Sequence, residues 1–93
     1  MVTREQIEAA LDLEKNNPYQ TKGIDHEARV IALLRERIPY KECASIISGA
    51  EHNIVYLCGV YKATLYLTEE DLVILADCNC FIHEDNDCIT LFV

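Results

Sequence analysis

The sequence predicts an α+β domain in which three N-terminal helices pack on a small, mainly antiparallel C-terminal sheet, with one further short helix. Apolar residues recur at helical spacing in the first half of the chain, whereas β-branched and aromatic runs dominate after Gly49. A chain of 93 residues, 51% of them apolar, has room for one hydrophobic core. Residues 1–93 are therefore expected to form a single domain.

The first two helices are predicted from their caps and their apolar spacing. Thr3 and Gln6 fit the capping-box pattern, and the apolar positions that follow predict a helix over 4–15. Asp25 is the expected N-cap of a second helix over 26–37, which carries one apolar stripe.

The middle of the chain is expected to change from helix to strand. A third helix is predicted over 39–48, with Pro39 in its first turn and Gly49 as its C-cap. Residues 54–58 and 64–68 have the composition and alternation of strands, which predicts a hairpin across 59–62.

The short helix of the C-terminal half is predicted over 69–76. Thr68 is a suitable N-cap, and the three acids that follow it suit the positive end of a helix dipole. The apolar run 72–75 could equally form a buried strand.

The last prediction is a hairpin of strands 79–84 and 88–93 joined by a turn at 85–87. One face of its second strand carries Ile89, Leu91 and Val93. Such an apolar strand must be covered, and a homodimer formed through this C-terminal strand is one way to cover it.

The charge of the chain is −8 and is unevenly distributed. Residues 1–46 hold seven Lys or Arg and eight Asp or Glu, whereas residues 47–93 hold only Lys62 and eight acids. The two halves therefore carry −1 and −7. A negative field of this kind repels phosphate and attracts basic partners.

The acids of the second half are the candidate partner-binding residues, because they fall at predicted loops and element ends. They are Glu69, Glu70, Asp71, Asp77, Glu84, Asp85 and Asp87. Three tyrosines of the same region, Tyr56, Tyr61 and Tyr66, are candidate anchors, since tyrosine flanked by charge is common at binding surfaces.

Four soft or borderline metal ligands fall within eleven residues, namely Cys78, Cys80, His83 and Cys88. A hairpin could bring them together around zinc. The spacing is not a standard one, and on a strand His83 would point away from the face shared by Cys78 and Cys80. We therefore expect buried, reduced thiols, and neither a metal nor another cofactor.

Residues 29–61 resemble the helix-turn-helix of resolvase-type DNA-binding domains. The resemblance rests on segments 32–36, 39–48 and 53–56, with a small residue, Ala44, at the expected helix crossing. It implies a transcriptional regulator, dimeric in form, whose basic side carries Arg29, Arg35, Arg37 and Lys41. The segment that would read DNA, however, contains no Lys or Arg, so direct binding of nucleic acid is not our first expectation.

Several other classes of function are not expected. No serine or cysteine has a local activating base, and three glycines cannot build a phosphate-binding loop, so we predict that the protein is not an enzyme. No apolar run approaches the roughly 20 residues of a membrane span, and no signal peptide opens the chain. With an odd number of cysteines, five, the chain is expected to be cytoplasmic.

The leading hypothesis is an acidic interaction protein that occludes a basic, nucleic-acid-binding surface of another protein and so inhibits it. In size and charge such a domain is similar to phage-encoded anti-defence proteins such as anti-CRISPR inhibitors. The alternatives are the helix-turn-helix regulator and a homo-oligomeric structural module.

Overall fold

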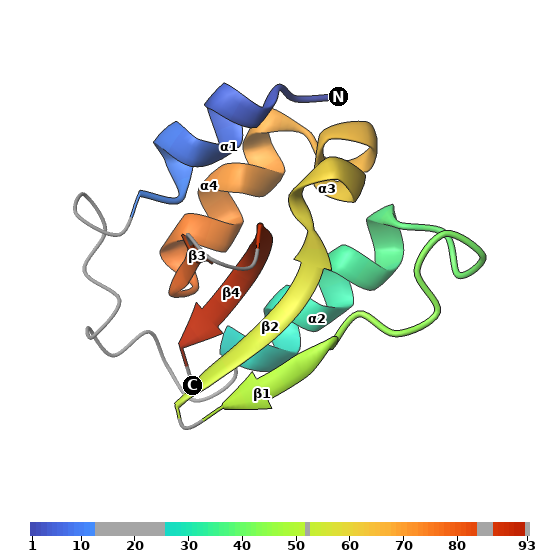
Figure 1. Ribbon diagram of the computed structural model, residues 1–93. Helices are drawn as coiled ribbons and strands as arrows, with labels where there is room; N and C mark the ends of the chain where they lie inside the picture. Colours follow the sequence, from blue (N-terminus) through green and yellow to red (C-terminus); the bar gives the residue numbers. More distant parts are fainter. Residues whose placement is uncertain (13–25, 52, 84–86, 93) are drawn as a thin grey trace.

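The computed structural model describes residues 1–12, 26–51, 53–83 and 87–92. In that part of the chain four helices and four strands form an α+β fold in the order α-α-β-β-α-α-β-β (Figure 1). The strands make one antiparallel sheet with the order β1-β2-β4-β3. The predicted fold class is confirmed, but the expected separation of three helices from a later sheet is wrong.

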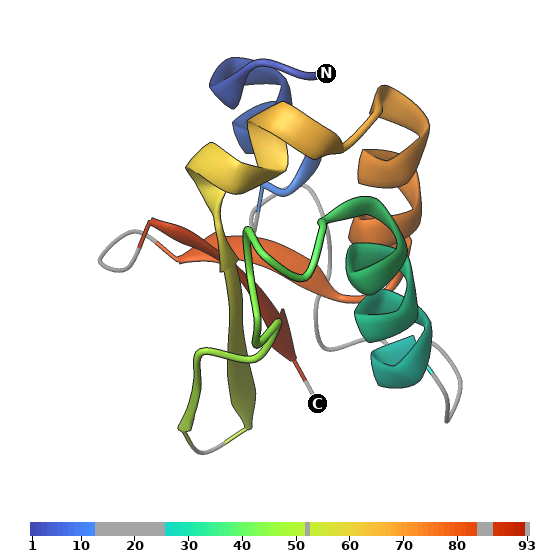
Figure 2. The ribbon, with the colours of Figure 1, turned by 90° about the vertical axis from the view of Figure 1, so that its right-hand side faces the viewer.

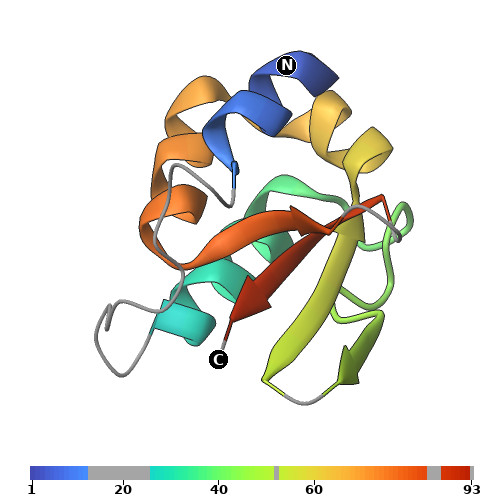
Figure 3. The ribbon, with the colours of Figure 1, turned by 60° about the vertical axis from the view of Figure 1, so that its left-hand side comes forward.

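Helices α2 (His26–Arg37) and α4 (Glu69–Asp77) lie side by side on one face of the sheet (Figure 2). Helices α1 (Arg4–Ala10) and α3 (Val60–Tyr66) lie together at one end of the molecule, and α1 also contacts α4 (Figure 3). Buried apolar side chains from all four helices meet those of the sheet in one core. Its fully buried members include Ile7, Val30, Leu34, Ala63, Leu75, Ile89 and Leu91.

Helix α1 begins at the predicted capping box, in which Thr3 and Gln6 satisfy each other's backbone N–H groups. It is shorter than the expected 4–15, because it ends at Ala10 with Leu11 as its C-cap. Residues 13–15 lie outside the described part. Helix α2 has the bounds that its apolar stripe predicted, while the expected N-cap Asp25 also lies outside the described residues.

The third helix predicted over 39–48 is not formed. The chain makes a single turn, in which Pro39 accepts hydrogen bonds from the backbone N–H groups of Glu42 and Cys43 at 2.9 and 3.1 Å. The carbonyls of Cys43 and Ala44 then accept hydrogen bonds from Arg35 and make no helical bonds of their own. Gly49, expected as a C-cap, instead begins β1 (Gly49–Glu51).

Strand β2 (Ile54–Gly59) confirms the strand predicted at 54–58, but it pairs with β1 and with β4 (Cys88–Phe92). The predicted hairpin across 59–62 is wrong, because residues 60–66 form α3. Val60, Ala63 and Leu67 are almost fully buried at helical spacing, and this burial outweighs the alternation that suggested a strand over 64–68.

Helix α4 confirms the helix predicted over 69–76 and excludes the alternative strand over 72–75. Its capping box joins Thr68 and Asp71. The C-terminal hairpin is also confirmed, as β3 (Cys80–His83) paired with β4. Residues 84–86 and 93 lie outside the described residues.

Strand β4 occupies an interior position in the sheet, with β2 on one edge and β3 on the other. Ile89 and Leu91, which were predicted to share one face, both belong to the core and are almost fully buried. Because both edges of β4 are paired, the expected homodimer through this C-terminal strand has no free edge to use.

Candidate partner-binding surface

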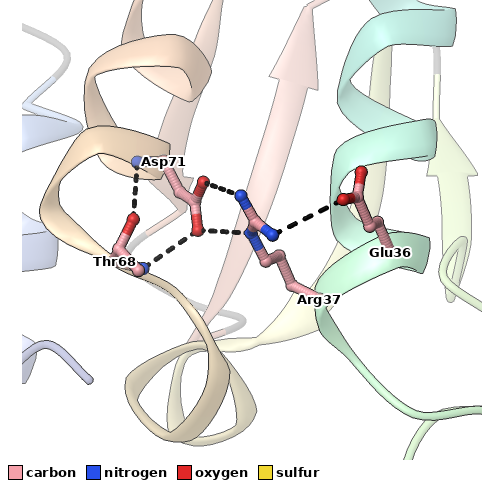
Figure 4. Close-up of polar contacts among 4 residues, drawn as sticks. All are labelled: Glu36, Arg37, Thr68 and Asp71. Carbon is pink, nitrogen blue, oxygen red and sulfur yellow. Dashed lines mark hydrogen bonds and ion pairs between the residues drawn. The ribbon is translucent and has the colours of Figure 1, made fainter.

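A buried polar contact joins α2 to α4 through Arg37 and Asp71 (Figure 4). The guanidinium donates two hydrogen bonds to the carboxylate, from Nε at 2.9 Å and from Nη2 at 3.2 Å. The same carboxylate accepts the backbone N–H of Thr68 at 3.0 Å, so one side chain both caps α4 and fixes it to α2. The Asp71 side chain is only 2% exposed.

Burial by itself raises the pKa of Asp71, but the hydrogen bonds from Arg37 and from the backbone of Thr68 outweigh it. The net pKa lies below the ordinary value of 3.8, so the carboxylate is ionised at neutral pH. The same hydrogen bond raises the pKa of Arg37. Asp71 was predicted to bind a partner protein. Its carboxylate instead points inward and accepts hydrogen bonds from Arg37 and Thr68.

The outer side of α4 carries exposed acids around an exposed valine. Glu69, Glu70 and Asp77 are all exposed, and Val73 is 68% exposed between them. Residues 69, 73 and 77 are four apart and therefore lie on one side of the helix. We call these four residues the α4 face. The amide of Gln6 on α1 donates a hydrogen bond to Glu69 at 2.5 Å, which ties this face to the neighbouring helix.

Asp87 lies apart from the α4 face, in the turn before β4. It forms an ion pair with Arg4 of α1, whose hydrogen bond lowers the pKa of the carboxyl. Arg4 also bonds to Glu8 at 2.8 Å. The candidate acids Glu84 and Asp85 lie outside the described residues.

All four arginines of the chain contact partners within the protein. Besides the pairs of Arg4 and Arg37, Arg29 donates to the sulfur of Cys78 at 3.8 Å, and Arg35 donates to the carbonyls that follow α2. Lys62 forms an ion pair with Glu42 at 2.6 Å. These contacts engage the four arginines and Lys62 with groups of the same chain.

The candidate tyrosines lie on two elements. Tyr61 and Tyr66 belong to α3, where Tyr61 is 70% exposed and Tyr66 packs partly against the core. Tyr56 lies on β2, and its hydroxyl donates a hydrogen bond to Glu51 at 2.9 Å. Only Tyr61 has the exposure expected of a binding anchor.

The candidate metal ligands lie on three elements. Cys80 pairs with Leu91 in the β3–β4 hairpin and belongs to the core, as Cys78 does, while the backbone of His83 pairs with that of Cys88. Cys78 is buried at the C-terminus of α4. Within the described ranges, no group of three or more His, Cys, Asp or Glu is arranged to hold a metal ion.

Three thiols line one pocket of about 480 Å³ between β2 and the segment before β1, namely Cys43, Cys58 and Cys88. All five cysteines are free, and only Cys43 is not buried. Burial raises the pKa of Cys58 to about 12, so its thiol is protonated and a poor nucleophile at neutral pH.

The helix-turn-helix prediction is wrong. It requires helices on both sides of a turn within residues 39–61, but residues 39–48 are not helical and 54–59 form a strand of the sheet. Arg35 and Arg37, assigned to its basic side, are engaged in contacts within the fold.

Sequence reasoning missed two features of this surface. The Arg37–Asp71 pair joins residues 34 positions apart, and no local pattern reveals such a contact. Val73 could have been found, because it stands four residues from both Glu69 and Asp77.

No family model, curated protein or solved structure matches the chain. No helix among the described residues has the length and apolar character needed to cross a membrane.

Proposed function

We propose that the protein is an acidic interaction module that uses the α4 face to occupy a basic, nucleic-acid-binding surface of a partner protein, and so inhibits that partner. The observation that carries this proposal is an exposed apolar side chain, Val73, set among the exposed carboxylates of Glu69, Glu70 and Asp77. Carboxylates steer a basic partner, and an apolar centre supplies contact area that loses water on binding.

The electrostatics of the remaining surface support the same proposal. The ion pairs of Arg4, Arg37 and Lys62 place positive charge against Asp87, Asp71 and Glu42, which are not residues of the α4 face. The field over this face attracts a surface that normally binds phosphate, and occupation of that surface excludes the nucleic acid by steric overlap. Neither a cofactor nor a reaction is required.

The first test is a pull-down with the tagged protein from the native host's lysate, at low and moderate salt and with or without nuclease. We expect one basic nucleic-acid-binding protein to be recovered independently of nuclease, with recovery falling as salt rises. The recovered protein should lose its nucleic acid when the acidic protein is added.

Charge-reversal substitutions test whether the α4 face binds the partner. Glu70→Lys and Asp77→Lys should each slow association by roughly tenfold at low salt, whereas Glu51→Lys, an equal charge change on β1, should leave it near the wild-type rate. Affinity that is insensitive both to salt and to these reversals would refute the proposal. Retention on DNA alone would also contradict it.

A further inference from the structure

A second surface, separate from the α4 face, is a groove along α2. It measures about 740 Å³ and lies between the helix and the segment that leads to β1. Figure 2 shows the backbone of this segment turning back beside α2. One wall is formed by Ala28, Ile31 and Ala32 of α2, and the other by the segment 44–47. Ile47 on this second wall is 48% exposed.

The groove is held open by contacts within the chain. Arg35 donates hydrogen bonds to the carbonyls of Cys43 at 2.9 Å and of Ala44 at 3.1 Å, and its guanidinium stacks on Tyr40 at 4.5 Å. Ile46 is buried beneath the second wall. The two walls therefore keep their separation without an occupant, which reduces the entropy lost on binding.

The two ends of the groove carry opposite charges, Glu27 at the start of α2 and Arg35 two turns later. The hydrogen-bond acceptors of Arg35 are neutral carbonyls, so they leave its positive charge available to an acid. Ile31 lies midway between the two charged residues. If α2 is laid antiparallel against a copy of itself about Ile31, each Glu27 lies opposite the Arg35 of the other copy.

From this self-complementary pattern we infer that the groove is the interface of a homodimer, in which two α2 helices pack antiparallel. The alanines at positions 28 and 32 allow the helix backbones to approach closely, and Ile47 of each copy covers apolar surface of the other. Two Glu27–Arg35 pairs set the direction of the helices, because a parallel arrangement would place like charges together.

The homodimer does not depend on the function proposed for the α4 face. Helix α2 contacts α4 through Arg37, on the flank away from Arg35 and the groove. Dimerisation through the groove therefore leaves both α4 faces of the pair exposed.

The test is the oligomeric state of the whole protein, measured by light scattering and sedimentation over a range of concentrations. Wild type should show twice the 10.6 kDa mass of one chain. Glu27→Arg and Arg35→Glu should each raise the dissociation constant of the homodimer about tenfold, because each variant homodimer places like charges opposite each other. An equimolar mixture of the two variants should restore a heterodimer.

Arg35 also donates hydrogen bonds to the carbonyls of Cys43 and Ala44, so its replacement could change the groove itself. A further pair of variants therefore leaves Arg35 in place. Ala32→Glu on the groove should give a monomer, and the matched control Ala9→Glu, on the exposed side of α1, should remain dimeric. Circular dichroism verifies that each variant is folded. A wild type that is monomeric at every concentration, or a dimer unaffected by Ala32→Glu, would overturn the inference.

Discussion

At the scale of single residues, Asp71 joins two helices and caps one of them. Its carboxylate accepts hydrogen bonds from Arg37 and from the N-terminus of α4, and it is almost fully buried. A buried carboxylate is tolerated only when its acceptor positions are filled, so the loss of either partner is costly. This explains why an acid within an exposed acidic run is not available to a partner protein.

The pH dependence of stability should reveal this pair. Because the folded pKa of Asp71 lies below 3.8, its contribution is complete above that pH and is lost as the pH falls through the lowered pKa. Asp71→Asn should reduce the free energy of unfolding at pH 7 by about 1–3 kcal/mol. The difference from wild type should shrink below about pH 3.8 in urea titrations, and a difference independent of pH would contradict this account.

The sequence placed Asp71 in the first turn of a helix but did not reveal which way its side chain points. Thr68 followed by three acids predicted the helix and its cap correctly, because capping is a local pattern. Which of the three acids points inward depends on where α2 lies, and residues 34 positions apart carry no local signal of contact. Glu69 and Glu70 remained exposed, as predicted.

At the scale of elements, local patterns predicted α2, α4 and the β3–β4 hairpin. For α4 the capping box agrees with the helix rather than with the strand that the apolar run 72–75 also allowed. Helix α3 was not predicted, because the apolar positions of residues 60–67 fit both strand alternation and helical spacing. The pattern of burial, at Val60, Ala63 and Leu67, is that of a helix.

The helix predicted over 39–48 is absent for another reason. Arg35 donates hydrogen bonds to the carbonyls of Cys43 and Ala44, which a helix would have used for its own backbone bonds.

The two capping boxes provide a matched test of the predicted helix starts. Thr3→Ala and Thr68→Ala each remove the hydroxyl that accepts a backbone N–H, and each should lower the free energy of unfolding by about 1 kcal/mol. Chemical denaturation measures both. A Thr→Ser replacement at either position keeps the acceptor and should retain most of the stability. Unchanged stability in both alanine variants would refute the role of the caps.

At the scale of the whole molecule, charge and burial divide the surface into distinct regions. The arginines are occupied within the fold, the α4 face is acidic with an apolar centre, and the α2 groove is apolar with one charge of each sign. The net charge of −8 predicted an acidic surface, but only the fold reveals which carboxylates face outward together.

Thiol labelling reports on the integrity of the whole fold. Cys43 is the one cysteine of the five that is not buried, whereas burial raises the pKa of both Cys58 and Cys80. An aromatic disulfide reagent should therefore label one thiol rapidly in the native protein and the other four only on unfolding. Cys43→Ser should remove the rapid phase, and rapid labelling of several thiols would contradict the burial described above.

The interior position of β4 also governs when the sheet can form during synthesis. Strands β2 and β3 are not paired with each other, and β4 lies between them. Until residues 88–92 have left the ribosome, β2 can pair only with the three-residue β1, and β3 has no strand partner in the described chain. Two-stranded ribbons of this size are barely stable in water. We therefore expect the four-stranded sheet to become stable only when β4 has joined β2 to β3.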